Sequence, residues 1–178
     1  MNPNFPLTHL LPADAAHPEH ADAATFGQFV GTWDMDMAFF DRAGRSIYHH
    51  KGVWSFAWVL DGRAIQDVLT YANRTAPHSL APYQRNIGTS LRWYDPHAAQ
   101  WVVLWLGANS GNLVWLRGGR VGDEIHLFGD EPDGTVNQWM FTDITPEAFH
   151  WIGRLSDDGG QSWWVEQEMK AVHRVTGR

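Results

Sequence analysis

The stretch HWIGRLSDDGGQSWWVEQEM, His150–Met169, contains two runs of alternating side chains on either side of a turn. In the first run, apolar residues such as Trp151 alternate with residues such as Arg154. Between the runs, Asp-Asp-Gly-Gly favours a tight connection, because carboxylates accept backbone N–H bonds and glycine adopts positive φ readily. The stretch therefore predicts an antiparallel β-hairpin.

Similar turn signals recur along the chain at intervals of roughly ten to eighteen residues, which is typical of an antiparallel meander. Up-and-down order over ten strands favours closure, because a closed barrel leaves no exposed sheet edge. We therefore predict an all-β fold, a single antiparallel up-and-down β-barrel of about ten strands. The expected strands span 29–40, 45–60, 63–73, 86–94, 100–106, 111–118, 122–129, 135–143, 147–155 and 162–172.

Composition limits the functions that the chain can serve. Its 178 residues carry a net charge of -7, which argues against nucleic-acid binding, and the absence of cysteine excludes disulfides. No signal-peptide pattern and no long apolar run is seen, so we expect a cytoplasmic protein that does not enter a membrane. We divide the chain into an N-terminal arm, 1–24, with a short helix around Ala13–Phe29, and a barrel domain, 25–174.

Matching the two runs of the opening hairpin predicts which side chains face inward. Pairing Leu155 with Trp163 places Glu166 and Glu168 on the solvent face, so they do not form the paired carboxylates of a glycosidase. The predicted interior face holds Phe149, Trp151, Gly153, Leu155, Trp163, Val165, Gln167 and Met169.

The other registers are predicted in the same way. Asp34 is expected opposite Lys51, the Asp61–Gly62 turn pairs Trp54 with Leu69, and Trp139 is matched to Trp151. The strands over 86–129 are too uniformly apolar for a register to be assigned. Polar residues predicted to face the interior are Tyr48, His50, Asp67, Tyr71, Asn73, Asn137 and Gln167.

The segment FVGTW, Phe29–Trp33, resembles the Gly-x-Trp signature that begins the first strand in the calycin superfamily, which includes lipocalins and fatty-acid-binding proteins. LDGR at Asp61, RWYDPHAAQW at 92–101 and the segment SDDGGQSWWVEQEMKAVHR resemble bacterial lipocalin-like domains more closely. The resemblance implies that Trp33 plugs the closed end of the barrel. It also implies that the connection Arg74–Asn86 arches over the open end.

Two departures from the family pattern concern the ligand. DRAGR follows the first strand directly, so the helix pair of fatty-acid-binding proteins is absent. Their paired arginines have no counterpart here, because Arg154 is predicted to face outward. Fatty acid is therefore not the expected ligand.

SDDGGQSW, Ser156–Trp163, also resembles the Asp-box of sialidase propellers. Propellers repeat the motif from blade to blade, whereas this chain has one copy. We therefore interpret the motif as a hairpin turn.

The expected function is binding of a small, largely apolar and preferably aromatic molecule inside the barrel, with no cofactor. The alternative is a cofactor-free cyclase or isomerase in the same cavity, with His50 and Tyr71 as candidate acid and base. A third possibility is a filled barrel that acts through its surface, with a homodimer as one possible assembly. The predicted ligand-binding residues are Met35, Met37, Tyr48, His50, Trp54, Tyr71, Asn73, Asn137, Trp139, Trp151 and Gln167.

The ten histidines of the chain raise the question of a metal or haem site. His17 and His20 lie in the arm, and His49 and His50 point to opposite faces of a strand, so no metal site is predicted. Some related barrels bind haem through one histidine near the last strand, and His173 lies in such a region. Those barrels carry glycines after Gly-x-Trp, whereas this chain has Asp-Met-Asp.

Overall fold

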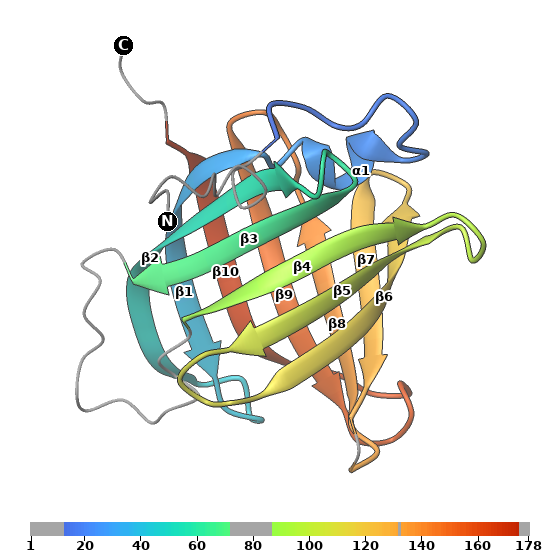
Figure 1. Cartoon of the computed structure of the whole chain (residues 1–178). Coiled ribbons are helices and arrows are strands. Elements are labelled where there is room, and N and C mark those ends of the chain that lie inside the picture. The colour runs from blue at the N-terminus through green and yellow to red at the C-terminus, as the bar shows by residue number, and fades with distance from the viewer. Residues whose placement is uncertain (1–12, 72–86, 132, 175–178) are drawn as a thin grey trace, which may run out of the picture.

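The computed structural model describes residues 13–71, 87–131 and 133–174, which form a β-barrel with one short helix (Figure 1). The helix, α1, is Ala23–Gly27, shorter than the predicted helix around Ala13–Phe29. The strands are β1 (Gly31–Phe40), β2 (Ser46–Val59), β3 (Ala64–Tyr71), β4 (Gly88–Asp95), β5 (Gln100–Gly107), β6 (Leu113–Val121), β7 (Glu124–Asp130), β8 (Val136–Thr142), β9 (Ala148–Ser156) and β10 (Trp164–His173).

The ten strands form one closed antiparallel barrel in up-and-down order. Each strand pairs with its neighbours in sequence, and β1 closes the ring by pairing with β10, with Met37 opposite Met169. The predicted fold class is confirmed. No helix in the part of the chain that the structure describes is both long and apolar enough to cross a membrane.

The predicted registers were correct at one hairpin and wrong by two residues at two others. Across β2–β3, Trp54 pairs with Leu69 as predicted. Across β1–β2, Asp34 pairs with Val53, not with Lys51, and across β8–β9 Trp139 pairs with Gly153, not with Trp151. Because side chains alternate with a period of two, a shift of two leaves every side chain on its predicted face.

The β9–β10 register requires a correction that changes the interior. Leu155 pairs with Trp164, and a β-bulge follows between Val165 and Gln167. Trp163 and Val165, predicted to be interior, lie outside: Val165 pairs with Arg154, and the Trp163 ring packs on Phe128. The extra residue of the bulge is Glu166, which was predicted to face away from the lumen; it lines the mouth of the cavity while staying exposed to solvent.

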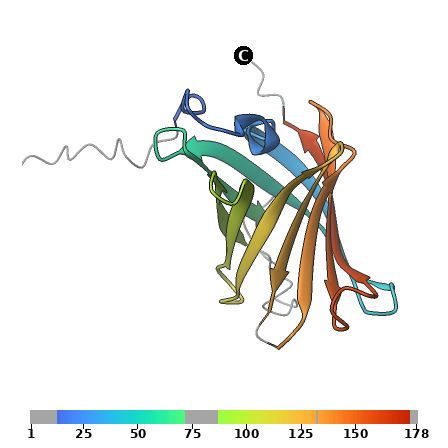
Figure 2. The same ribbon diagram turned by 90° about the vertical axis from the view of Figure 1, so that its right-hand side faces the viewer.

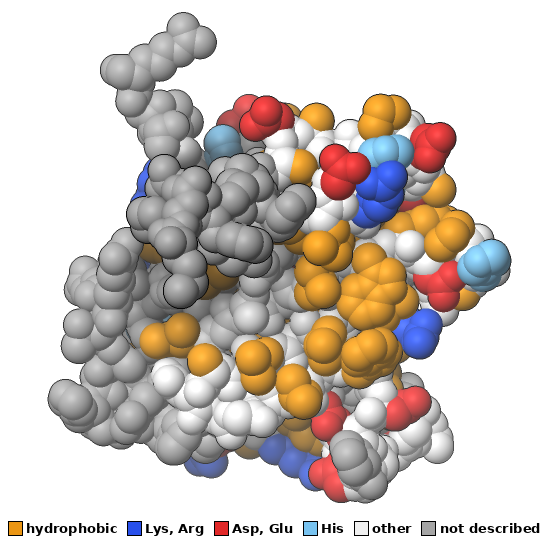
Figure 3. Space-filling view, in the orientation of Figure 1, with side chains coloured by type: hydrophobic (Ala, Val, Ile, Leu, Met, Phe, Trp, Pro, Cys, Tyr) orange, Lys and Arg blue, Asp and Glu red, His pale blue; other side chains and the backbone are white. Residues whose placement is uncertain are grey.

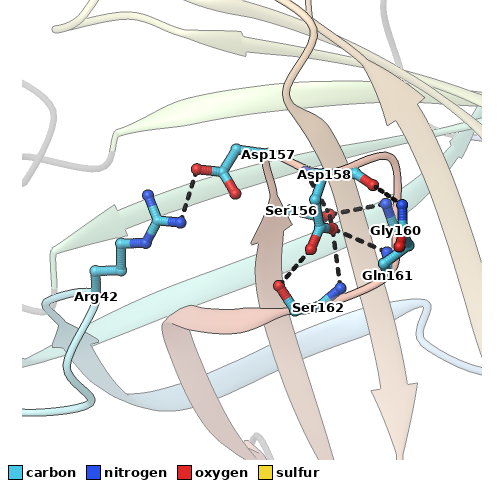
Figure 4. A network of polar contacts seen from close by, with 7 residues as sticks. All are labelled: Arg42, Ser156, Asp157, Asp158, Gly160, Gln161 and Ser162. Atoms are coloured by element: carbon cyan, nitrogen blue, oxygen red, sulfur yellow. Dashed lines mark hydrogen bonds and ion pairs between the residues drawn. The ribbon is translucent and has the colours of Figure 1, made fainter.

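The Asp-box segment forms the β9–β10 turn (Figure 4). The Asp158 carboxylate accepts hydrogen bonds from the backbone N–H groups of Gln161 and Ser162, both at 2.9 Å, and from the Ser162 hydroxyl at 2.6 Å. Gly159 and Gly160 adopt φ of 71° and 88°. The motif acts as a turn device, as predicted.

Aromatic side chains fill the end of the barrel next to α1, at the top in Figure 2. Trp33 is 1% exposed and donates its indole N–H to the Phe29 carbonyl at 2.8 Å. Phe29 in turn packs on Phe141 and Phe149, with ring centroids 4.9 and 4.8 Å away. This end is closed by side chains, as the resemblance implied for Trp33.

A buried ion pair lies among these rings. Arg92 and Asp67 are both fully buried, and the Arg92 guanidinium donates to Asp67 Oδ2 through Nε at 2.8 Å. Asp67 also accepts the Trp54 indole N–H at 2.8 Å. The inward position of Asp67 matches the prediction, whereas the inward position of Arg92 was not predicted.

Candidate functional site

A cavity of about 330 Å³ opens at the end of the barrel opposite α1, where the β7–β8 and β9–β10 hairpins lie (Figure 2). Its volume falls at the lower end of the range for small-molecule sites. The lining residues are Phe39, Trp54, Leu69, Trp105, Asn112, Val114, Glu131, Asp133, Thr135, Asn137, Trp139, Trp151, Leu155, Glu166, Gln167 and Met169.

Five of the predicted ligand-binding residues line this cavity. They come from four strands and combine ring walls with two amide groups: Trp54, Asn137, Trp139, Trp151 and Gln167. Their inward positions follow from strand alternation, which the two-residue shifts of register preserved. The strands therefore bring these side chains together around one space.

Other predicted residues do not line the cavity. Met35 and Met37 are almost fully buried in the core. His50 and Tyr48 face each other at the rim with ring centroids 5.0 Å apart, and the His50 ring stacks on the cavity residue Phe39 at 5.9 Å. Burial lowers the pKa of His50, which favours its neutral form.

The side chains of the remaining two predicted residues, Tyr71 and Asn73, lie outside the part of the chain that the structure describes. The Tyr71 backbone pairs with Gly52 as predicted, but its side chain is outside the description. Asn73 and the predicted lid, Arg74–Asn86, lie outside the described residues.

Three tryptophans form a continuous wall of the cavity. The Trp139 ring packs edge to face against Trp151, with centroids 5.3 Å apart, and against Trp105 at 6.1 Å. Trp151 is 4% exposed, and its indole N–H has no hydrogen-bond partner among the residues that the structure describes. A buried donor of this kind costs free energy unless a further acceptor, such as a bound ligand, satisfies it.

Carboxylates lie around the mouth of the cavity. Glu131 accepts a hydrogen bond from Asn137 Nδ2 at 2.5 Å, and burial together with the charge of Asp133 raises the pKa of Glu131. The pKa of Glu166 is also raised by burial. Water still reaches Glu166, but the side chain lies in a concave pocket, where the surrounding protein replaces part of its hydration.

Sequence reasoning missed Trp105, Glu131 and Glu166 as residues of the site. Trp105 lies on a strand for which no register was assigned. Glu131 follows the end of β7, in a connection that carries no alternation signal. Glu166 depends on the β-bulge; the only sequence signal is the run Trp163-Trp164-Val165, which breaks the alternation of the strand.

The structure gives no support to haem binding at His173, because this residue packs against Trp33 at the closed end, with centroids 4.8 Å apart. Within residues 13–71, 87–131 and 133–174, no three His, Asp or Glu side chains are grouped so that they could hold a metal ion.

No family model and no curated protein matches the chain. Among solved structures, the barrel is similar to the S-type phycobiliprotein lyase CPES from Guillardia theta, with a TM-score of 0.58 and 10% identity over 85% of this chain and 92% of that one. Two weaker matches are EF1p2_mFAP2b bound to DFHBI and a de novo designed fluorescence-activating β-barrel. The first has a TM-score of 0.36 and 13% identity, covering 87% of this chain and all of its own (100%). The second has a TM-score of 0.33 and 15% identity, covering 86% and 99%. At these identities the likeness to the lyase shows a shared barrel fold.

Proposed function

We propose that the barrel binds a small, largely apolar molecule with an aromatic body in the cavity at its open end. The observation that carries this proposal is the 330 Å³ space walled by Trp54, Trp105, Trp139 and Trp151. Rings of this size stack on a flat ligand and exclude water from it. Asn137 and Gln167 supply polar groups that would orient the molecule.

The lyase from Guillardia theta offers a parallel, because its name refers to phycobiliproteins and it shares this fold. At 10% identity the parallel extends to the architecture and not to a particular ligand. Membership of the calycin superfamily, a cytoplasmic location and a homodimer stay predictions from the sequence.

Titration with a library of apolar and aromatic compounds tests the proposal. We expect bound compounds to quench tryptophan fluorescence and to raise the thermal midpoint, because ligands that bind only the folded state stabilise it. Val114→Phe should abolish both effects, since Val114 lines the cavity and the larger ring would occupy it. Val121→Phe is the matched control on the same strand, because Val121 is 56% exposed and does not line the cavity.

Compounds that bind wild type and Val114→Phe equally would contradict this site. A library that produces neither quenching nor a thermal shift would contradict the function.

A second candidate function is cofactor-free acid–base catalysis on such a molecule. The observation that favours it is that Glu166 lines the mouth of the same cavity as the tryptophan rings; its pKa is also raised, and catalytic carboxyls are often tuned in this way. The sequence candidates His50 and Tyr71 stay proposals for the same role. In an enzyme, His50→Ala, Tyr71→Phe or Glu166→Gln would reduce turnover while leaving the affinity for a neutral substrate nearly unchanged.

A further inference from the structure

We infer that the ligand is an organic cation: an aromatic body that carries an ammonium, pyridinium or similar charged nitrogen, bound with its charge at the mouth of the cavity. This inference rests on the proposed function and narrows its ligand class.

The charges around the cavity are all of one sign. Glu131, Asp133 and Glu166 line it, and none of the described lining residues is Lys, Arg or His. Hydrogen bonds from Thr135 lower the pKa of Asp133, so that this carboxylate is ionised at neutral pH. The mouth therefore presents negative charge to an incoming molecule, and the net charge of -7 attracts cations at longer range.

Two of the arginines that the structure describes near this end of the barrel are already engaged. Arg42 forms an ion pair with Asp157 at 2.7 Å (Figure 4), and its guanidinium lies over the Trp164 ring. Arg154 donates to Gln138 on the outer face and lies over Trp163. Neither arginine contacts a carboxylate of the cavity in the structure, so the charge at the mouth stays uncompensated by these groups.

The closed half of the lumen shows how this protein accommodates a cation. There the Arg92 guanidinium lies 5.0 Å from the Phe26 ring and 5.8 Å from the Trp54 ring, and pairs with Asp67. Aromatic faces attract cations through their quadrupoles, and the effect grows when water is excluded. The open half repeats the combination of rings and carboxylates without a cation from the protein among the described lining residues.

The buried Trp151 indole provides independent evidence for a ligand. It lines the cavity, and its N–H lacks an acceptor among the described residues. A ligand that carries an ether, carbonyl or hydroxyl oxygen in its inner part would satisfy this donor. A metal ion would not, and the carboxylates are not grouped for metal binding within the described ranges.

Three fluorescent probes test the inference on the full chain. Thioflavin T is a cationic benzothiazolium, its analogue without the ring N-methyl group is neutral, and anilinonaphthalene sulfonate is anionic. We expect thioflavin T to bind at least about tenfold more tightly than the neutral analogue, because a charge pair at a partly shielded site strengthens binding well beyond its value in water. The anionic probe should bind more weakly than either.

Charge-removing variants identify the groups responsible. Glu166→Gln and Glu131→Gln should each weaken thioflavin T binding by about fivefold and leave the affinity for the neutral analogue within about twofold. Glu168→Gln is the matched control, because Glu168 is on the same strand but on the outer face, 3.7 Å from His150. The wild-type comparison of the two benzothiazoles needs no variant, so it holds even if a variant fails to fold.

The outcomes separate the two proposals. Equal affinity for the charged and neutral probes, or tighter binding of the anion, would overturn the inference and leave the proposed function standing. If none of the three probes binds, the inference falls, and the function is decided by the compound library. If Val114→Phe binds the probes as tightly as wild type does, the proposed site falls, and the inference falls with it.

Discussion

Removing the Arg92 side chain is the most direct test of how the closed half of the barrel is stabilised. Both Arg92 and Asp67 are fully buried, and Arg92 approaches Asp67 Oδ2 through Nε at 2.8 Å and through a terminal nitrogen at 2.6 Å. In Arg92→Met, the carboxylate would keep only the Trp54 indole at 2.8 Å and the Ser90 N–H at 3.3 Å.

The size of the effect follows from these contacts. A hydrogen bond to a charged group contributes about 1.5–3 kcal/mol, and breaking one side of a buried ion pair typically costs about 3–5 kcal/mol. Methionine fills much of the volume of the arginine stem, so a cavity adds little. We expect Arg92→Met to lower the free energy of unfolding by about 3–5 kcal/mol, a large share of the roughly 5–15 kcal/mol typical of a domain.

The double variant Asp67→Asn/Arg92→Met provides the control. Asparagine can still accept from Trp54 without leaving a buried charge, so the double variant should be more stable than Arg92→Met alone. Guanidinium denaturation followed by tryptophan fluorescence and circular dichroism measures both. A loss below about 1 kcal/mol in Arg92→Met, or a double variant no more stable than Arg92→Met, would refute the proposed coupling of Arg92 to Asp67.

Three other predictions concern the open half. Asp158→Ala should lower the thermal midpoint at pH 7, because hydrogen bonds to the carboxylate depress the Asp158 pKa. The stabilisation by this carboxylate is lost as the pH falls below 3.8. A difference in thermal midpoint between wild type and variant that persists in acid would contradict this account. Burial raises the Glu166 pKa above 4.5, so ionisation of this carboxyl costs stability as the pH rises through that value. Glu166→Gln should therefore raise the thermal midpoint at pH 7 and leave it unchanged at about pH 4. A lower thermal midpoint at pH 7 would refute this account. In Gly153→Ala, the new Cβ would lie 2.5 Å from the Trp151 ring. We therefore expect the free energy of unfolding, measured by denaturation, to fall by about 1–3 kcal/mol, and the probes to bind more weakly. Unchanged binding would show that the position of Trp151 is unimportant.

The barrel could be predicted from the sequence because its turns and its alternation agree. Asp61–Gly62 and the Asp158 turn mark where two hairpins reverse, and the alternating runs beside them give the inward faces. Exact pairings were harder, since a shift of two residues keeps the same faces and changes no pattern visible in the sequence.

The strands β4–β6 were predicted, but their registers were not assigned, for a different reason. Their outer face is itself apolar, and hydrophobic side chains gather over it in Figure 3. Trp93 packs on Trp115 at 5.6 Å, and Leu106 is 43% exposed. Alternation of apolar and polar residues is therefore absent, and the inward position of Arg92 has no local signature. Only tertiary packing, which puts Asp67 on the adjacent strand, explains a buried arginine there.

Part of the site was predicted, and one of its three carboxylates, Glu166, depends on the β-bulge in β10. Had β10 continued in regular register, Glu166 would point to the outer face of the barrel and the cavity would lose one of its three carboxylates. The bulge places Glu166 beside Gln167 instead, at a cost, because burial disfavours its charged form. A residue kept only for structure would support folding. If Glu166→Gln stabilises the free protein and weakens binding of a cation, these opposite effects identify Glu166 as a binding residue. Replacing a residue that serves only the structure would lower both the stability and the affinity.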